Sequence, residues 1–243
     1  MRINVMKTAK EMGADAAGLI AAKLNEAIAK QGYARLLLST GASQFEMFDA
    51  LVHEDVAWDK VTMFHLDEYV GLPETHKASF RKYLKERFVS QVNLREAVLV
   101  DGEGNIAEML AHLTKRVTEA PIDVAAIGIG ENAHVAFNDP PADFDTQESY
   151  IVVNLDERCK RQQVGEGWFA TLADVPSQAI SMTVSQMLKA KCIVSIVPHA
   201  VKAEAVKNTL SQEVNNMTPA TILKTHPDWN LYLDAESAKL FVV

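Results

Sequence analysis

The sequence predicts a three-layer α/β fold, Rossmann-like, in which a mostly parallel, twisted sheet carries helices on both of its faces. Two observations lead to this prediction. Short β-branched and apolar segments alternate with amphipathic helical segments along nearly the whole chain, and most of the short segments are apolar throughout. Such strands are typical of parallel sheets, because both of their faces are buried. With no internal repeat and no long linker, we expect a single domain over residues 1–243.

The composition excludes several classes of protein. Hydrophobic residues make up 48% of the 243 residues, which is enough for one substantial core. The net charge of −8 and the isoelectric point near 5.4 argue against nucleic acid or an anionic membrane as a partner. Cys159 and Cys192 are too few for a disulfide framework and have no metal-ligand spacing. Because the net charge is negative, an anionic ligand would need a local cluster of cationic side chains.

The N-terminal segment carries no signal-peptide pattern. Residues 1–5 lead into a lysine-bearing amphipathic segment instead of an apolar stretch. No apolar run elsewhere approaches the length of a membrane span. We therefore expect a cytoplasmic protein without membrane attachment.

The first predicted elements end in a candidate anion site. Apolar residues recur at helical spacing over residues 8–30, and residues 35–39 predict a buried strand. A small, hydroxyl-rich loop begins at the end of this strand and precedes a helix; it consists of Ser39, Thr40, Gly41, Ala42 and Ser43. Such a loop can bind an anion, although the pattern more often marks only a tight strand-to-helix turn. It is not a nucleotide P-loop, because no Gly-Lys-Ser/Thr follows at the required spacing.

Acidic residues follow the third predicted strand, residues 61–66. Alternation along a strand places His65 and Asp67 on the same side, and Glu68 comes directly after them. A carboxylate at the carboxyl end of a strand suits a general base, whereas the common alternative is an exposed acidic turn. The helix predicted over residues 77–89 carries a basic run that we interpret as a solvated surface.

A second polar loop follows the strand predicted over residues 122–127. Gly128 and Gly130 end this strand and allow a tight turn. Polar side chains then gather ahead of two prolines: Glu131, Asn132, His134, Asn138 and Asp139. Ligands of open α/β sheets bind at the carboxyl ends of the strands, where this loop lies. A histidine in this setting can act as an acid or base, and a loop whose polar groups only satisfy the backbone is about equally common.

The last third of the chain supplies further cations and strands. A polar segment follows the strand predicted over residues 150–155 and carries three cations within four positions: Arg158, Lys160 and Arg161. These side chains could together bind an anion. Lys202 stands at the start of a predicted helix, although the helix dipole favours negative charge at that end. An anion bound there would interact favourably with both the lysine and the dipole. The strands are predicted over residues 150–155, 179–184, 191–197 and 229–234. We expect the polar loops, residues 158–163 included, to converge on one rim of the sheet.

These motifs, in this order along nearly the whole chain, resemble the glucosamine-6-phosphate deaminase (isomerase) family, whose superfamily also holds 6-phosphogluconolactonase. The likeness rests on Leu-Ser-Thr-Gly-Ala-Ser at residues 38–43, on Asp-Glu-Tyr-Val-Gly-Leu-Pro at residues 67–73, on Gly-Ile-Gly with His-Val-Ala-Phe-Asn within residues 128–138, and on Lys-Ala at residues 202–203. The loop reads Ala-Phe-Asn where the lactonase branch has Ala-Ser-Leu-Phe-Pro. This difference favours the deaminase branch.

The resemblance implies a reaction and the residues that perform it. It implies conversion of glucosamine 6-phosphate, or a close analogue, to fructose 6-phosphate and ammonia without a cofactor or a metal. By the same resemblance, Asp67 would move the C2 proton to C1, His134 would open the pyranose ring, and Lys202 with residues 39–43 would hold the phosphate. Glu68 and Gly130 are further substrate-contact candidates. A small sugar phosphate is then the expected partner, and a homo-oligomer is left open.

Several departures from the family pattern concern His134 and the phosphate. Asn132 stands where the family has an aspartate, and Asp139, one methylene shorter, stands for a glutamate. We therefore expect Asn132 and Asp139 to orient His134 with less charge, and the Asp139 carboxylate to be drawn back. The phosphate-binding arginine of the family is also absent. Its expected replacements are the three cations of residues 158–161.

Other functions stay open. A lactonase-type hydrolase would use His134 to activate water, although hydrolysis needs no C2 base at Asp67. A non-catalytic sugar-phosphate sensor would result if the relay had decayed at Asn132 and Asp139. A metal site made of His65, Asp67, His134 and Asp139 is a weaker alternative, because these positions form no recognised ligand set.

Overall fold

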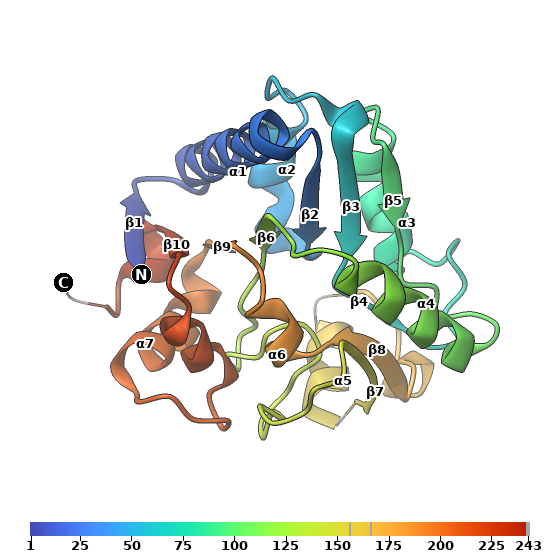
Figure 1. The fold of residues 1–243 in the computed structure, drawn as a ribbon. Coiled ribbons are helices and arrows are strands. Elements are labelled where there is room, and N and C mark those ends of the chain that lie inside the picture. Colours follow the sequence, from blue (N-terminus) through green and yellow to red (C-terminus); the bar gives the residue numbers. More distant parts are fainter. Residues whose placement is uncertain (156, 166, 242–243) are drawn as a thin grey trace.

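The structure, a computed structural model, describes residues 1–155, 157–165 and 167–241, and it confirms the three-layer architecture (Figure 1). A seven-stranded central sheet is parallel throughout. In their order across the sheet, its strands are β1 (Arg2–Met6), β10 (Trp229–Asp234), β9 (Cys192–Val197), β6 (Val124–Ala126), β2 (Ala34–Leu38), β3 (Val61–His65) and β5 (Glu96–Val98). The central strands β9, β6 and β2 are buried along their whole length. Both faces of the sheet therefore need cover.

Helices supply this cover and divide the core into two layers. On one face lie α1 (Ala9–Gln31), α2 (Phe45–Leu51), α3 (Phe80–Leu84) and its π-helical continuation η3 (Lys85–Val89). On the other lie α4 (Ile106–Thr118), α6 (Val184–Met187), α7 (Ala203–Ser211) and the 3-10 helix η6 (Pro219–Thr225). The remaining short helices are η1 (Ala42–Gln44), η2 (Trp58–Lys60), η4 (Leu172–Asp174), η5 (Ala200–Lys202) and α8 (Ala235–Ala238). None of the described helices is long and apolar enough to cross a membrane.

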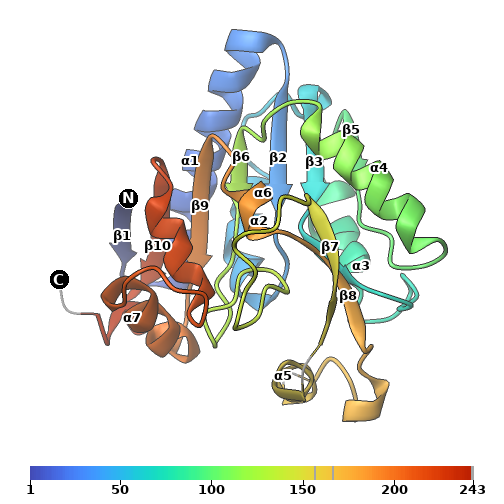
Figure 2. The same cartoon turned by 60° about the horizontal axis from the view of Figure 1, so that its bottom comes forward.

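A second, smaller sheet holds two of the predicted strands. In it β8 (Gln178–Met182) pairs antiparallel with β7 (Tyr150–Asn154) and with β4 (Asp67–Tyr69). The chain passes between the sheets at Leu66, whose N–H donates to the Leu38 carbonyl (3.2 Å) and whose carbonyl accepts from the Met182 N–H (2.9 Å). Figure 2 shows this small sheet beyond the carboxyl ends of the main strands. The alternation of strands and helices predicted these strands but not their separate sheet.

The prediction of a polar loop over residues 158–163 was wrong, because these residues belong to helix α5 (Glu157–Gly165). Cys159 and Gln163, one helical turn apart, are both buried, whereas Arg161 is exposed. Cys159 packs in the small apolar cluster around Tyr69. The sequence analysis missed this amphipathic pattern because charged residues dominate the segment.

Candidate active site

A cavity of about 430 Å³ opens at the carboxyl ends of the central strands. Four segments that follow strands of the main sheet line it: residues 39–44 after β2, residues 66–67 after β3, residues between 128 and 137 after β6, and residues between 199 and 202 after β9. The remaining wall comes from residues between 77 and 83, from α5 and from Trp168. Its volume lies in the range of small-molecule sites.

The loop of residues 39–43 is fixed from two sides. Ser39 Oγ accepts a hydrogen bond from the Gly128 N–H (3.2 Å). Gly41 has a φ of 101°, which favours glycine, and its carbonyl accepts from the Tyr83 hydroxyl (2.8 Å). All five residues of the loop line the cavity. Their backbone and hydroxyl groups are thus preorganised at the place where the sequence predicted an anion.

Gly130 allows His134 to lie close to the backbone. A Cβ added at Gly130 would lie 2.2 Å from two atoms of the His134 ring. The Gly130 N–H also donates to the His134 carbonyl (2.9 Å), which closes the turn. Gly130 and His134 both line the cavity. The glycine therefore determines where the imidazole can stand.

Two acceptors hold the imidazole of His134. Asn132 Oδ1 accepts the backbone N–H of His134 (3.1 Å) and lies 2.5 Å from Nδ1 of the ring. Asp139 Oδ1 lies 3.2 Å from the same Nδ1. Because both neighbours of Nδ1 are acceptor oxygens, the proton of the neutral ring is on Nδ1 and Nε2 is left to accept. This is the tautomer that an acid–base residue at the cavity needs.

The expectation that Asp139 is drawn back from His134 was wrong. The Asn132 amide donates to Asp139 Oδ1 (2.9 Å), so the amide joins the carboxylate and the imidazole in one cluster. Burial acts to raise the pKa of Asp139, but hydrogen bonds from His134, Asn132 and Cys159 outweigh it and lower the pKa below its ordinary value. Asp139 is therefore a charged partner for an imidazolium.

Asp67 is the second ionisable group at the cavity. Asp67 is only 6% exposed, and burial, together with the nearby charge of Glu68, raises the pKa of its carboxyl to about 8. No hydrogen bond to this carboxyl is found among the described residues. The ionised form of Asp67 is therefore a strong base, because no partner stabilises its charge.

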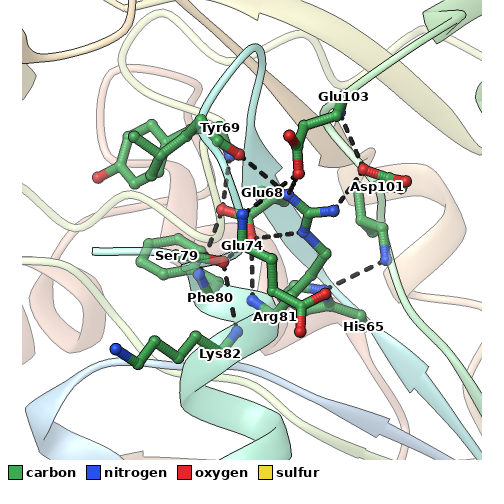
Figure 3. Close-up of polar contacts among 12 residues, drawn as sticks. His65, Glu68, Tyr69, Glu74, Ser79, Phe80, Arg81, Lys82, Asp101 and Glu103 are labelled. Carbon is green, nitrogen blue, oxygen red and sulfur yellow. Dashed lines mark hydrogen bonds and ion pairs between the residues drawn. The ribbon is translucent and has the colours of Figure 1, made fainter. Parts of the chain in front are cut away.

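Glu68 was predicted to contact the substrate, and the structure places it elsewhere. Its side chain is completely buried and does not line the cavity. As Figure 3 shows, its carboxylate accepts hydrogen bonds from Ser79 Oγ (2.9 Å) and from the backbone N–H groups of Tyr69, Phe80 and Arg81 (2.9, 3.2 and 2.8 Å). Glu68 therefore fastens the start of α3, part of the cavity wall, to β4.

Arg81 completes this network, and its predicted solvation was wrong. The guanidinium is buried and contacts Glu68 (3.4 Å), Asp101 and Glu103 (2.9 Å), and it donates to the Leu72 carbonyl (2.9 Å). The two outer carboxylates come from residues 20 and 22 positions further along the chain. Three acidic residues thus compensate one buried cation.

The cations of the cavity agree with the prediction at Lys202 and differ from it elsewhere. Lys202 is almost buried and lines the cavity. Lys160 and Arg161 are not among the described residues of the cavity wall, and the side chain of Arg158 lies outside the described part of the structure. Lys77 lines the cavity instead, and its ammonium donates to the Gly167 carbonyl (2.6 Å).

Sequence reasoning missed several residues of the cavity wall: Lys77, Tyr83, Gln163 and Trp168. Lys77 was placed at the first position of the helix predicted over residues 77–89, whereas the N-cap residue Ser79 starts the helix after it and leaves Lys77 in the preceding loop. Gln163, in α5, and Trp168, just beyond it, follow the three cations on which the sequence analysis concentrated. Gln163 Oε1 accepts from the Tyr69 hydroxyl (2.7 Å).

His65 does not face the cavity. It is completely buried, its Nδ1 accepts from the Val100 N–H (3.3 Å), and burial lowers its pKa to about 3. Within the described ranges, no group of three or more His, Cys, Asp or Glu side chains could hold a metal ion. The alternative of a metal site that includes His65 therefore has no support from this geometry.

A family model described as glucosamine-6-phosphate isomerases/6-phosphogluconolactonase matches residues 7–231. The chain belongs to this family. The matched range includes every segment that lines the cavity, and it confirms the resemblance seen in the motifs.

Curated relatives within the family match over almost their whole length. Two Streptococcus pneumoniae proteins named glucosamine-6-phosphate deaminase, from serotype 4 and from strain Hungary19A-6, are each 33% identical to this chain over 236 residues. The matches cover 97% of this chain and 100% and 99% of the two relatives.

Solved structures of the family share the fold. A monomeric glucosamine-6-phosphate deaminase has a TM-score of 0.89 and 26% identity, over 99% of this chain and 100% of its own. A 6-phosphogluconolactonase from Trypanosoma brucei has a TM-score of 0.81 at 15% identity, over 99% and 98% of the two chains, and at that identity it shows the fold alone. The predicted fold class is therefore confirmed.

Proposed function

We propose that this chain is an amino-sugar phosphate deaminase/isomerase that converts glucosamine 6-phosphate, or a close analogue, to fructose 6-phosphate and ammonia. The observation that carries the proposal is one cavity lined by Asp67, His134, Lys202 and the loop of residues 39–43. An aldose-to-ketose shift needs a ring-opening acid–base, a base that reaches two adjacent carbons, and an anchor for the phosphate. The names of the curated relatives support the same reaction.

His134 opens the ring in this proposal. Nε2 takes the proton of the O1 hydroxyl and passes it to the ring oxygen O5 as the C1–O5 bond breaks, and the open-chain aldehyde forms. The proton on Nδ1 stays directed at Asn132 and Asp139. The Asp139 carboxylate stabilises the imidazolium while it carries the extra proton.

Asp67 moves the proton between the carbons. It takes the C2 proton, the electron pair forms the C1–C2 double bond, and the aldehyde oxygen takes a proton from the C2 ammonium group, which gives a neutral enolamine. Return of a proton to C1 gives the C2 imine, which water hydrolyses to the ketone with release of ammonia. The substrate and one water thus become fructose 6-phosphate and ammonia. An ammonium group on C2 favours the ionised form of Asp67, whose own pKa is raised.

The test is deuterium incorporation from heavy water into glucosamine 6-phosphate, with ammonia assayed in the same tubes. We expect deuterium at the exchanging carbon together with ammonia release. Asp67→Asn should abolish both and retain phosphosugar binding, because the base is lost and the anchor is kept. Exchange that survives Asp67→Asn would remove Asp67 from this role.

The same experiment separates the alternatives. Exchange without ammonia would indicate an isomerase for another sugar phosphate. Binding without exchange would favour the lactonase or the non-catalytic sensor, and hydrolysis of a phosphosugar lactone would then identify the lactonase. The cytoplasmic location stays a prediction, and the oligomeric state stays open.

A further inference from the structure

His199 has a backbone conformation that is unusual for any residue other than glycine. It follows β9, precedes η5, and has a φ of 77° and a ψ of 149°. This region of backbone space is occupied almost exclusively by glycine, because a Cβ there meets the neighbouring backbone. A histidine at this position is therefore held in a strained conformation.

Backbone contacts on both sides maintain the strain. The His199 N–H donates to both carboxylate oxygens of Asp234, at 3.1 Å each. Asp234 is itself fixed, because it caps α8 by accepting the Ser237 N–H (2.8 Å). The His199 carbonyl accepts the Lys202 N–H (3.0 Å). Glycine could make every one of these contacts without strain.

The side chain is therefore the feature that distinguishes histidine from glycine here. The imidazole is exposed, and within the described part of the chain it makes no hydrogen bond. His199 lines the cavity together with Lys202 and the loop of residues 39–43. The strained backbone thus holds a donor-bearing ring at the end of the cavity to which we assigned the phosphate.

We propose that His199 is a substrate-binding residue whose imidazole contacts the phosphate group of the substrate beside Lys202. This inference rests on the phosphate position of the proposed function. The ligand group it requires is a phosphate monoester dianion, to which the imidazole N–H donates a charge-assisted hydrogen bond. Strained residues persist at ligand sites because the surrounding structure over-determines them, as Asp234 does here.

The test compares His199→Gly with His199→Ala. Glycine removes both the ring and the strain, whereas alanine removes the ring and keeps the strained Cβ. We expect both variants to bind glucosamine 6-phosphate and inorganic phosphate about tenfold more weakly by calorimetry, since each loses a charge-assisted hydrogen bond. The unliganded glycine variant alone should unfold at a higher temperature than the wild type.

Lys202→Ala serves as the reference for a lost phosphate contact. An unchanged affinity of His199→Gly for inorganic phosphate would overturn the proposal. A loss of affinity seen only in a variant whose melting temperature also falls would overturn it as well, because unfolding would then explain the loss. If the wild type shows neither deuterium exchange nor ammonia release, the proposed function fails. Weakened phosphate binding by His199→Gly would still uphold the role of His199 in that case.

Discussion

At the scale of single residues, the ionisation of Asp67 decides how the proposed reaction responds to pH. A base must be deprotonated to act, and burial raises the pKa of Asp67 to about 8. We predict that kcat/KM for glucosamine 6-phosphate falls about tenfold per pH unit below this value, because the ionised fraction of the free enzyme falls by that factor. A pH–rate profile between pH 5 and 9 measures this limb. A flat profile across this range would contradict the assignment.

The same group links stability to pH. The unfolded chain loses the Asp67 proton near pH 3.8, whereas the folded chain loses it near pH 8. The folded state therefore binds more protons between these values, and the stabilisation is full below pH 3.8 and lost as the pH rises through 8. We predict that the melting temperature of Asp67→Asn falls less than that of the wild type between pH 5 and 8. Parallel curves from thermal unfolding would refute this linkage.

Asn132 supplies the His134 cluster with a hydrogen-bond donor that an aspartate in its place would lack. Its amide donates to Asp139 while its carbonyl oxygen faces the imidazole. Asn132→Asp would lose that donor and set two carboxylates about one hydrogen-bond length apart. We predict a loss of roughly 1–2 kcal/mol in the free energy of unfolding, measured by urea titration at pH 8. Stability equal to the wild type would show that the cluster tolerates a second carboxylate.

At the scale of elements, the Glu68–Arg81 network holds the start of α3 against β4. Removing one member of a buried ion pair leaves the other charged and unpaired, which costs about 3–5 kcal/mol. We predict a loss of this size in the free energy of unfolding for Arg81→Met. The matched control is Lys85→Met on the same helical segment, whose pair with Glu74 is half exposed (45% and 39%), and it should cost less than about 1 kcal/mol. Equal losses in the two variants would contradict the structural role of the network.

The packing of α1 on α2 provides another prediction at this scale. A Cβ added at Gly13 would lie 2.6 Å from the backbone carbon of Glu46, whereas one added at Gly18 meets nothing within 4 Å. We predict that Gly13→Ala destabilises the protein by about 1–3 kcal/mol through overpacking. Gly18→Ala should stabilise it by about 0.5–1 kcal/mol through helix propensity. Denaturant titration of the pair measures both, and the same sign for both would refute the packing argument.

At the scale of the whole molecule, the sequence predicted what local patterns determine. Apolar runs located the strands of the parallel sheet, and the ends of those strands located Asp67 and His134. Features that depend on distant partners were not predictable. The burial of Arg81 depends on Asp101 and Glu103, and the separate sheet depends on pairing between β4 and β8, more than a hundred residues apart. A basic run or a short apolar run carries no signal of such partners.

The cavity is shared between two sheets that contribute different groups. The loop of residues 39–43 and Lys202 continue strands of the large sheet. Asp67 begins β4 of the small sheet, and the loop that carries His134 is fastened to β8, because the Phe137 N–H donates to Ser181 Oγ (3.1 Å) and the Asn138 amide donates to the Met182 carbonyl (2.9 Å). In the proposed function, the large sheet therefore supplies the groups that bind the phosphate, and the small sheet supports the groups that act on the rest of the sugar. If the proposed function holds, substitutions in the small sheet can change the reaction while phosphate binding by the large sheet is retained.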